Sequence, residues 1–237
     1  MNAKQNKKVR FEELGIKEYQ PAWDYQEQLM KEILDIKIKN RDFSSEDTLT
    51  TPNHLLFVEH PHVYTLGKSG DEQNMLANTD KLKEIDATFV KTNRGGDITY
   101  HGFGQIVGYP ILDLENFFTD IHLYMRNLEE VIIRTIAEYG LQGERSQGET
   151  GVWLDVGKPY ARKMCAMGVK ASRWVTLHGF ALNVNTDMRY FEYIIPCGIK
   201  DKQVTSLKRE LERDVNIEEV KQKIKKHFVE VFGCELF

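Results

Sequence analysis

Apolar residues recur every three or four positions in three stretches of the chain, and this spacing predicts three amphipathic helices. The helices are expected over residues 22–38, over residues 123–139, and between Asn216 and Gly233. Asn216 is the predicted N-cap of the last helix, because its side chain can accept hydrogen bonds from the free amides of the first turn. Gly140 lies where a left-handed C-terminal cap of the second helix is expected.

Short apolar runs between these stretches predict strands. The runs cover residues 55–58, 106–114, 151–156, 163–169 and 175–184. Pro110 lies in the second run, which predicts an edge strand or a bulge there, because proline has no N–H to donate to a neighbouring strand. Strands and helices are interspersed without a regular βαβ repeat, so we expect an α/β fold in which a mixed sheet is packed by helices.

Length and composition indicate one soluble domain. The chain of 237 residues has no Ser/Pro-rich linker, so residues 1–237 are expected to form a single domain. Residues 1–10 are basic, are expected to be flexible, and lack the apolar segment of a signal peptide. No apolar run approaches the roughly 20 residues of a membrane span. We therefore expect a cytoplasmic protein without membrane contact, and its net charge of −4 gives no overall attraction to nucleic acid.

The cysteines and histidines do not predict a metal site. The three cysteines are an odd number with no C-x-x-C spacing, which argues against a disulfide framework and a structural zinc site. His60 and His62 lie two residues apart, but no carboxylate or cysteine lies at a supporting spacing. Metal sites depend on ligand number and geometry, so no metal is expected.

The stretch from Thr92 to Gln105, T-N-R-G-G-D-I-T-Y-H-G-F-G-Q, carries the strongest site signal in the first half of the chain. Glycine is favoured where the backbone turns with positive φ or lies close to a ligand, so Arg94 and the two glycines after it suggest a backbone cradle beside a fixed cation. A glycine-rich hairpin that only turns the chain is the alternative. Tyr100 and His101 favour the site, because a plain hairpin does not require them.

Strand alternation predicts which side chains share a face in the second half of the chain. Lys163, Cys165 and Met167 are expected on one face of their strand, which places a lysine beside a thiol. In the next strand, the residues expected to share a face are Thr176, His178 and Phe180.

Two thiols are candidates for the reactive thiol. Cys197 lies between Pro196 and Gly198, in a predicted turn, where a thiol can be exposed and reactive. Cys165 is its rival because of the predicted neighbouring lysine. Cys234 is assigned to packing, since an isolated cysteine more often behaves as a small buried residue.

Four segments together resemble a known family. R-G-G-D-I-T-Y-H-G-F-G-Q, R-K-M-C-A-M-G-V, L-H-G-F-A-L-N-V and P-C-G-I are similar, in this order, to segments of the lipoyl(octanoyl) transferases, the octanoyltransferases that begin lipoic acid assembly. The resemblance implies a domain like the catalytic domains of lipoate and biotin protein ligases. It also implies that octanoyl moves from acyl carrier protein to a lysine on the lipoyl domains of 2-oxoacid dehydrogenases and on the glycine cleavage H protein.

Carried over position by position, the resemblance makes Cys197 the thiol nucleophile and Lys163 the catalytic lysine. The acyl-binding residues that it implies are Arg94, Gly95, Gly96, Asp97, Ile98, Thr99, Tyr100, His101, Ala166, Met167, Gly168, His178, Gly179 and Phe180. Phe103 stands where the family commonly has proline, and Met164-Cys165 replaces the more usual Ile-Ala. Both departures could alter the pocket wall.

The chemistry expected of these residues is ping-pong acyl transfer. A thiol with a pKa near 8.5 is only about 3% thiolate at pH 7, so a nearby ammonium is needed to stabilise the thiolate. Lys163 would first stabilise the Cys197 thiolate and later, when neutral, accept a proton from the incoming amine. Thioester exchange is nearly neutral and amide formation is downhill, so no ATP, metal or other cofactor is expected.

Two other functions remain open. A lipoate–protein ligase shares the implied fold but activates a free acid with ATP, and its R-R-x-S-G-G-G type of signature is absent. A non-catalytic module that binds an acyl group or its carrier is the second, and the retention of Lys163 and Cys197 argues against it.

A local excess of positive charge suggests a docking surface. Between Asp155 and Trp174 the basic residues outnumber the acidic ones. Acyl carrier proteins are acidic as a family, so complementary charge would speed their association. The predicted docking residues are Lys158, Arg162, Lys170 and Arg173.

Overall fold

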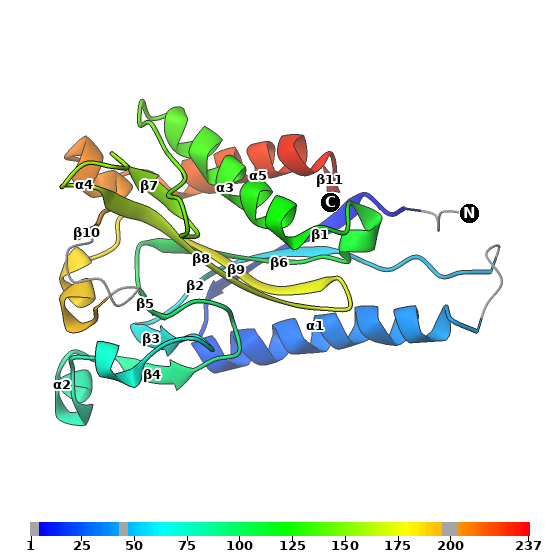
Figure 1. The fold of residues 1–237 in the computed structure, drawn as a ribbon, viewed down its shortest axis with the longest axis horizontal. Coiled ribbons are helices and arrows are strands. Elements are labelled where there is room, and N and C mark those ends of the chain that lie inside the picture. The colour runs from blue at the N-terminus through cyan, green and yellow to red at the C-terminus, as the bar shows by residue number, and fades with distance from the viewer. Residues whose placement is uncertain (1–4, 43–46, 196–202) are drawn as a thin grey trace.

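The structure is a computed structural model that describes residues 5–42, 47–195 and 203–237. A large β-sheet lies in the middle of the molecule, with α3 (Ile121–Ala137) and α5 (Ile217–Phe232) on one face and α1 (Tyr19–Lys39) on the other (Figure 1). Parallel and antiparallel strand pairs both occur in this sheet. The expected α/β fold with a mixed sheet packed by helices is therefore confirmed.

The three predicted helices are confirmed with shifts of a few residues at their ends. The side chain of Asn216 accepts the amides of Glu218 and Glu219, as expected of the N-cap of α5, and Gly233 ends this helix with φ of +58°. Gly140, after α3, has φ of +79°. Asp120, which the sequence reading had not singled out, caps the start of α3 through the amide of Leu123. Short polar side chains thus set the starts of both helices on this face.

The large sheet has a central antiparallel part and parallel margins. Its hydrogen-bonded order is β10-β8-β9-β6-β2-β1-β11, with β7 paired to β8 as a further branch. The strands are β1 (Lys8–Ile16), β2 (His54–Glu59), β6 (Gln105–Ile111), β7 (Val152–Leu154), β8 (Arg162–Ser172), β9 (Val175–Asn183), β10 (Gln203–Val204) and β11 (Glu235–Leu236). The five predicted strands correspond to β2, β6, β7, β8 and β9. Lys8, Val9 and Arg10, expected in a flexible tail, form the start of β1 and pair with β11 and β2.

A smaller sheet lies beside the start of α1 (Figure 1). In it, β3 pairs in parallel with β4 and antiparallel with β5. An apolar cluster that includes Tyr64, Tyr100 and Phe191 joins this sheet to the 3-10 helix η3 (Met188–Tyr193). The remaining elements are β3 (Val63–Leu66), β4 (Thr88–Lys91), β5 (Ile98–His101), α2 (Thr79–Glu84), α4 (Leu207–Leu211), η1 (Glu72–Asn74), η2 (Leu114–Asn116) and η3 (Met188–Tyr193).

Pro110 shows how an interior strand tolerates proline. The sequence predicts an edge strand or a bulge, but β6 lies between β2 and β9. The ladder between β6 and β9 stops at the Gly108–Phe180 pair, and the same register resumes at an isolated bridge between Asp113 and Val175. The missing N–H of Pro110 therefore falls where the ladder is already interrupted, and the prediction of an edge strand is wrong.

Apolar clusters fill both faces of the large sheet. The cluster under α3 and α5 includes Leu128, Ile132 and Phe228 with Phe57 of the sheet, and all are fully buried. The cluster under α1 includes Ile33 and a further set of sheet residues: Leu56, Val107, Tyr109 and Leu177. Within the described residues, no helix has the length and apolar character needed to cross a membrane.

Candidate active site

A cavity lies where the two sheets and the start of α1 meet. Its lining comes from β5, β6, β8 and β9, from the loop before β5, and from Tyr19. The predicted site residues that line it are Arg94, Gly96, Asp97, Ile98, Thr99, His101, Lys163, Ala166, Met167, Gly168, His178, Gly179 and Phe180. Gly95 and Tyr100 were predicted for the site but do not line the cavity. Tyr100 instead packs in the core of the small sheet, and its hydroxyl lies 2.6 Å from Nδ1 of His62.

Glycines allow three backbone segments to meet at one wall of the cavity. A Cβ on Gly168 of β8 would lie 2.6 Å from the carbonyl oxygen of Gly95, and a Cβ on Gly67 would overlap that of Gly96. The amide of Gly95 donates to the carbonyl of Val169 at 2.9 Å, which fastens the glycine-rich loop to β8. The expected backbone cradle is thus a close backbone crossing that only glycine permits.

A chain of buried hydrogen bonds, here called the pocket network, links Arg94, Thr65, His101, Gln105 and Asn183. Nη2 of Arg94 donates to the carbonyl of Thr65 at 2.6 Å and to its hydroxyl at 2.9 Å. Nε2 of Gln105 donates to Oδ1 of Asn183 at 2.9 Å, so Oε1 of Gln105 is the acceptor that lies 2.8 Å from Nδ1 of His101. The residues come from β3, β5, β6, β9 and the glycine-rich loop, so the network joins the two sheets.

The pocket network fixes the state of His101. Since Nδ1 donates to Gln105, Nε2 of the neutral ring accepts from the hydroxyl of Thr65 at 3.2 Å. Burial lowers the pKa of His101 well below its ordinary value, and the nearby His60 and Arg94 lower it further. Tyr19 stacks on His101 at 5.8 Å, and burial raises the pKa of Tyr19 to about 12. Both rings are neutral at pH 7, which suits a wall that contacts an uncharged chain.

His178 lies on the other side of the sheet from the one expected. Its φ is +62°, and its amide donates to Oε1 of Gln26 on α1 rather than to β6. The ring lies 5.8 Å from that of Trp23 on α1, whereas Phe180 packs in the cluster under α3 and α5. The prediction that Thr176, His178 and Phe180 share a face is therefore wrong for His178, because one left-handed residue reverses the alternation.

The side chain of His178 is held from outside the cavity. Nδ2 of Asn93 donates to Glu27 at 3.0 Å, so Oδ1 of Asn93 accepts from Nε2 of His178 at 2.8 Å. Burial lowers the pKa of His178 to about 3, helped by the charges of Arg94 and Lys170. His178 is thus a neutral residue of the cavity wall and is not a proton donor near pH 7.

A β-bulge separates Lys163 from Cys165. Trp153 of β7 pairs with Lys163 and Val152 pairs with Cys165, so Met164 is an extra residue in β8. Lys163 lines the cavity, while Met164 and Cys165 both belong to the core under α3 and α5. The prediction that Lys163 and Cys165 share a face is wrong for this reason.

The Cys165 thiol is unsuited to nucleophilic attack. It is fully buried, and burial raises its pKa far above the ordinary value of a thiol. Cys234, which does not line the cavity, also has its pKa raised by burial, to about 11. The third thiol, Cys197, lies outside the described residues. The described residues that flank its segment are both fixed: the amide of Ile195 donates to Asn74, and Gln203 pairs with Arg162 beside Lys163.

Comparison with known proteins identifies the family. The family model of the lipoyl protein ligase A/B catalytic domain matches residues 18–229. A protein of Christiangramia forsetii named octanoyltransferase is 66% identical over 232 residues, which cover 98% of each chain. Another of that name, from Flavobacterium psychrophilum, is 65% identical over 97% of this chain and 98% of its own. The chain belongs to the octanoyltransferase family. The resemblance found in the sequence is confirmed.

Solved structures extend the likeness at the level of the fold. The bipartite lipoate protein ligase of Thermoplasma acidophilum is 17% identical and aligns with a TM-score of 0.66. The alignment covers 99% of this chain and 86% of that chain. At this identity the comparison shows a common fold alone.

Several lining residues of the cavity were missed in the sequence. Tyr19 lies before the predicted helix of residues 22–38, although it is the first residue of α1 and lines the cavity. Asn183 and Thr150 lacked a signal of their own, since each is a common polar residue in a strand or a loop. Asn183 belongs to L-H-G-F-A-L-N-V, one of the four segments that resemble the family. A polar residue at this place in an otherwise apolar ending was the available sign that Asn183 has a role in the site.

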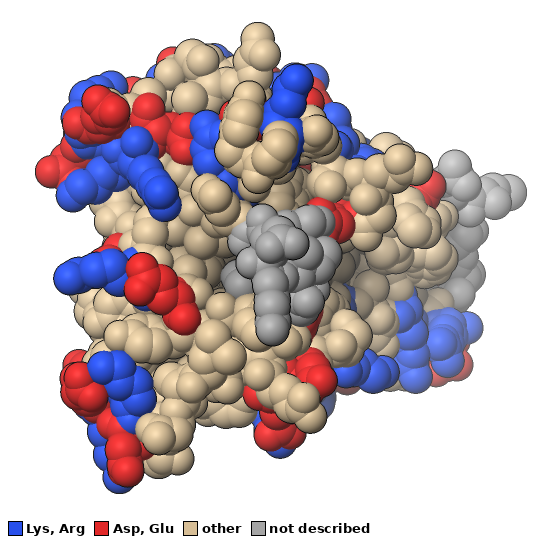
Figure 2. All heavy atoms as spheres, turned by 60° about the vertical axis from the view of Figure 1, so that its left-hand side comes forward, with Lys and Arg blue, Asp and Glu red and all other residues tan. Residues whose placement is uncertain are grey.

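Two of the four predicted docking charges are paired with carboxylates. The 11 residues of β8 lie between Lys158 and Arg173, and an extended strand of this length spans about 35 Å. The guanidinium of Arg162 donates to Asp155 at 2.5 Å and to both carboxylate oxygens of Glu210. Lys170 pairs with Glu27 at 3.5 Å. On the face shown in Figure 2, basic and acidic side chains lie next to one another. The docking surface therefore stays a prediction, and the ion pairs of Arg162 and Lys170 show that charge counted along the chain does not reveal which cations are already paired.

Proposed function

We propose that this protein is a cytoplasmic acyltransferase that moves an octanoyl group from octanoyl-acyl carrier protein to a lysine of lipoyl domains. The proposed acceptors are lipoyl domains of 2-oxoacid dehydrogenases and the glycine cleavage H protein. The observation that carries the proposal is that most of the residues predicted to bind an acyl chain line one cavity, with Lys163 in its wall. Close relatives named octanoyltransferase over nearly the whole chain support it.

The first half of the proposed reaction loads the enzyme. The thiolate of Cys197 attacks the carbonyl carbon of the octanoyl thioester, and the carrier leaves as a thiolate that takes a proton from the Lys163 ammonium. Lys163 as an ammonium stabilises the attacking thiolate. The acyl chain lies in the cavity against the neutral rings of His101, His178 and Phe180.

The second half transfers octanoyl to the acceptor. The amine of the acceptor lysine attacks the enzyme thioester, an amide bond forms, and the thiolate of Cys197 leaves. Lys163, now neutral, accepts the proton that the amine loses. The close crossing of the Gly168 and Gly95 segments fixes one wall of the cavity that Lys163 also lines.

Lipoate–protein ligase activity is the nearest alternative. The fold fits it, but the ligase structure shares only 17% of its residues with this chain, against 66% for an octanoyltransferase. A test without nucleotide distinguishes the two. Octanoyl-acyl carrier protein and a lipoyl domain are expected to suffice, while free octanoate is expected to be inert. Strict dependence on ATP would assign the chain to the ligases.

The decisive experiment identifies the acylated thiol. We expect the protein mixed with octanoyl-acyl carrier protein to gain one octanoyl group in an intact-mass measurement, and peptide mapping to place it on Cys197. Cys197→Ser should abolish transfer, whereas Cys165→Ala, the matched control, should keep most of it because this thiol is fully buried. An adduct on Cys165 would contradict the proposal, and so would normal transfer by Cys197→Ser.

A further inference from the structure

Glu129 of α3 is a buried carboxylate that the proposed reaction does not use. Its side chain is 0% exposed, and α3 otherwise turns apolar residues such as Leu128 and Ile132 to the core. Oε1 accepts the amide of Gly151 at 3.1 Å, and Oε2 lies 2.9 Å from Arg126 and 3.3 Å from Arg145. Burying a carboxylate costs free energy, so packing alone would favour an apolar residue here.

The partner of Glu129 lies directly against the lysine in the cavity. Gly151 has φ of +111°, and a Cβ added to it would overlap the carbonyl of Cys165 and lie 3.6 Å from Cε of Lys163. The next aromatic residue, Trp153, has its ring centre 4.6 Å from Nζ of Lys163. On the other side of Gly151, the hydroxyl of Thr150 donates to the carbonyl of Met167 at 3.1 Å. Residues 150–153 thus form a support along which the Lys163 side chain lies.

We infer that Glu129 is a positioning residue for acyl transfer, which holds residues 150–153 against β8 through the Gly151 amide and so fixes the ammonium of Lys163. This inference rests on the proposed function, because it takes Lys163 as the group that acts on thiol and amine. Burial raises the pKa of the Glu129 carboxyl, and the hydrogen bond from the Gly151 amide and the charges of Arg126 and Arg145 oppose this rise and favour the charged form. A charged acceptor makes a stronger hydrogen bond to the amide than a neutral one does.

The neighbouring Glu130 offers a matched control on the same helix. It binds Arg145 at 2.6 Å and Arg134 at 2.9 Å, so it shares an arginine with Glu129. Its side chain is 30% exposed, and its hydrogen bonds go to these arginines rather than to Gly151. Glu130→Gln therefore disturbs the surface ion pairs and leaves the support of Lys163 in place.

The test compares steady-state kinetics of full-length variants with octanoyl-acyl carrier protein and a lipoyl domain. Glu129→Leu keeps the volume and removes the acceptor, so kcat should fall about tenfold or more while KM for both substrates stays within about twofold, since small displacements of a reacting group are costly. Glu129→Gln should recover most of kcat, because its amide oxygen can still accept the Gly151 amide. Glu130→Gln should match the wild type.

If the wild type turns over normally, any one of three outcomes would overturn the inference. The first is full kcat in Glu129→Leu. The second is a loss of kcat in Glu129→Gln as large as that in Glu129→Leu, and the third is a loss of that size in Glu130→Gln. If Glu129→Leu does not fold in a thermal melt, Glu129→Asp takes its place, because it keeps the charge but is one methylene too short to reach Gly151. Full kcat in that variant would also overturn the inference. A wild type without transfer would instead count against the proposed function.

Discussion

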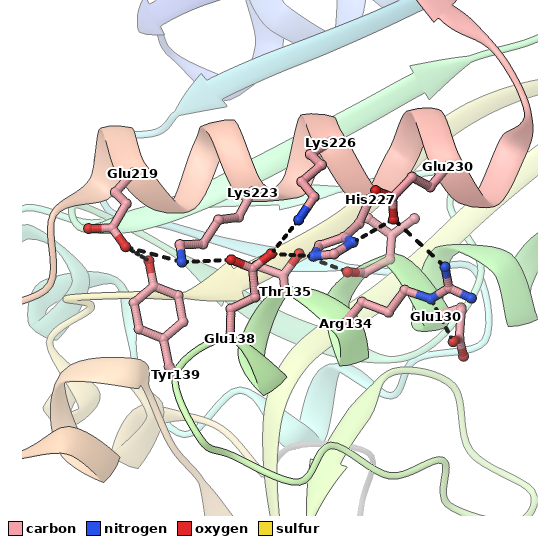
Figure 3. Close-up of polar contacts among 11 residues, drawn as sticks. Glu130, Arg134, Thr135, Glu138, Tyr139, Glu219, Lys223, Lys226, His227 and Glu230 are labelled. Carbon is pink, nitrogen blue, oxygen red and sulfur yellow. Dashed lines mark hydrogen bonds and ion pairs between the residues drawn. The ribbon is translucent and has the colours of Figure 1, made fainter.

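The pocket network and the polar contacts between α3 and α5 use similar residue types in opposite settings. In the pocket network, Arg94 is 8% exposed and its partner Thr65 is fully buried. Between α3 and α5, a row of charged and polar side chains joins the two helices (Figure 3). We call this row the helix network, and it comprises Glu130, Arg134, Glu138, Tyr139, Glu219, Lys223, Lys226, His227 and Glu230.

Burial decides what each network does. In the pocket network a lost partner leaves a donor or acceptor that water does not reach, so each group holds its neighbour in one orientation. In the helix network most side chains are partly exposed, with His227 as the buried exception, so water can replace a lost partner of the exposed groups and salt screens their charges. The first network therefore fixes the geometry of the cavity, and the second adds little to stability. The predictions below test this difference.

The largest effect is expected where the glycine-rich loop crosses β8. A Cβ in Gly168→Ala would lie 2.6 Å from the carbonyl oxygen of Gly95 and 3.3 Å from Cδ of Arg94, so the loop that carries Arg94 must move. We expect kcat/KM for octanoyl transfer to fall about a hundredfold, because catalysis is sensitive to shifts near 1 Å. Gly148→Ala is the control: its φ is +79° but nothing lies within 4 Å of the added Cβ, so it should keep normal activity. An active Gly168→Ala would show that the crossing is not needed.

A smaller effect is expected from removing one hydroxyl of the pocket network. Thr65→Val keeps the shape but removes the group that accepts from Arg94 and donates to His101, and this should lower the free energy of unfolding by about 1–3 kcal/mol. Thr135→Val is the matched control in the helix pair, since Thr135 is also fully buried. Its hydroxyl donates to the carbonyl of Val131 in its own helix, so its loss should cost less. Urea unfolding measures both, and equal losses would contradict the proposed difference.

The same comparison explains what the sequence could predict. The elements followed from local patterns: apolar spacing for α1, α3 and α5, apolar runs for the strands, and Asn216 and Gly233 for the ends of α5. The glycine-rich stretch and the motifs around Lys163 and His178 were recognisable because their residue types are unusual for plain packing. The cavity then gathers most of these residues in one place.

The errors came from single residues that change the direction of side chains. The extra Met164 places Cys165 in the core, and the left-handed backbone of His178 turns its ring to α1. Alternation assumes a regular strand, so neither event is visible in the pattern. Thr65 gave no signal because its role depends on two partners, Arg94 and His101, that the fold brings together. Arg162 was misread for the same reason, since Glu210 lies far from it in sequence.

The smallest effect is expected from Glu138, at the centre of the helix network. Hydrogen bonds from Lys223 and then His227 lower the pKa of Glu138 to about 2, and Lys226 also lies within reach (Figure 3). A carboxyl whose pKa is lower in the folded state stabilises the fold above its unfolded pKa near 4.5, and this contribution is lost as the pH falls toward 2.

Glu138→Gln should therefore lower the free energy of unfolding by no more than about 1 kcal/mol at pH 7 and low salt, because the side chain is 30% exposed and screened by water. The difference from the wild type should shrink in 1 M salt and should shrink again as the pH falls from 5 toward 2. Urea unfolding at each condition measures it, with octanoyl transfer at pH 7 expected to stay normal. A loss as large as that of Thr65→Val, unaffected by salt, would mean that the helix network is as well shielded from water as the pocket network, and the distinction between them would fail.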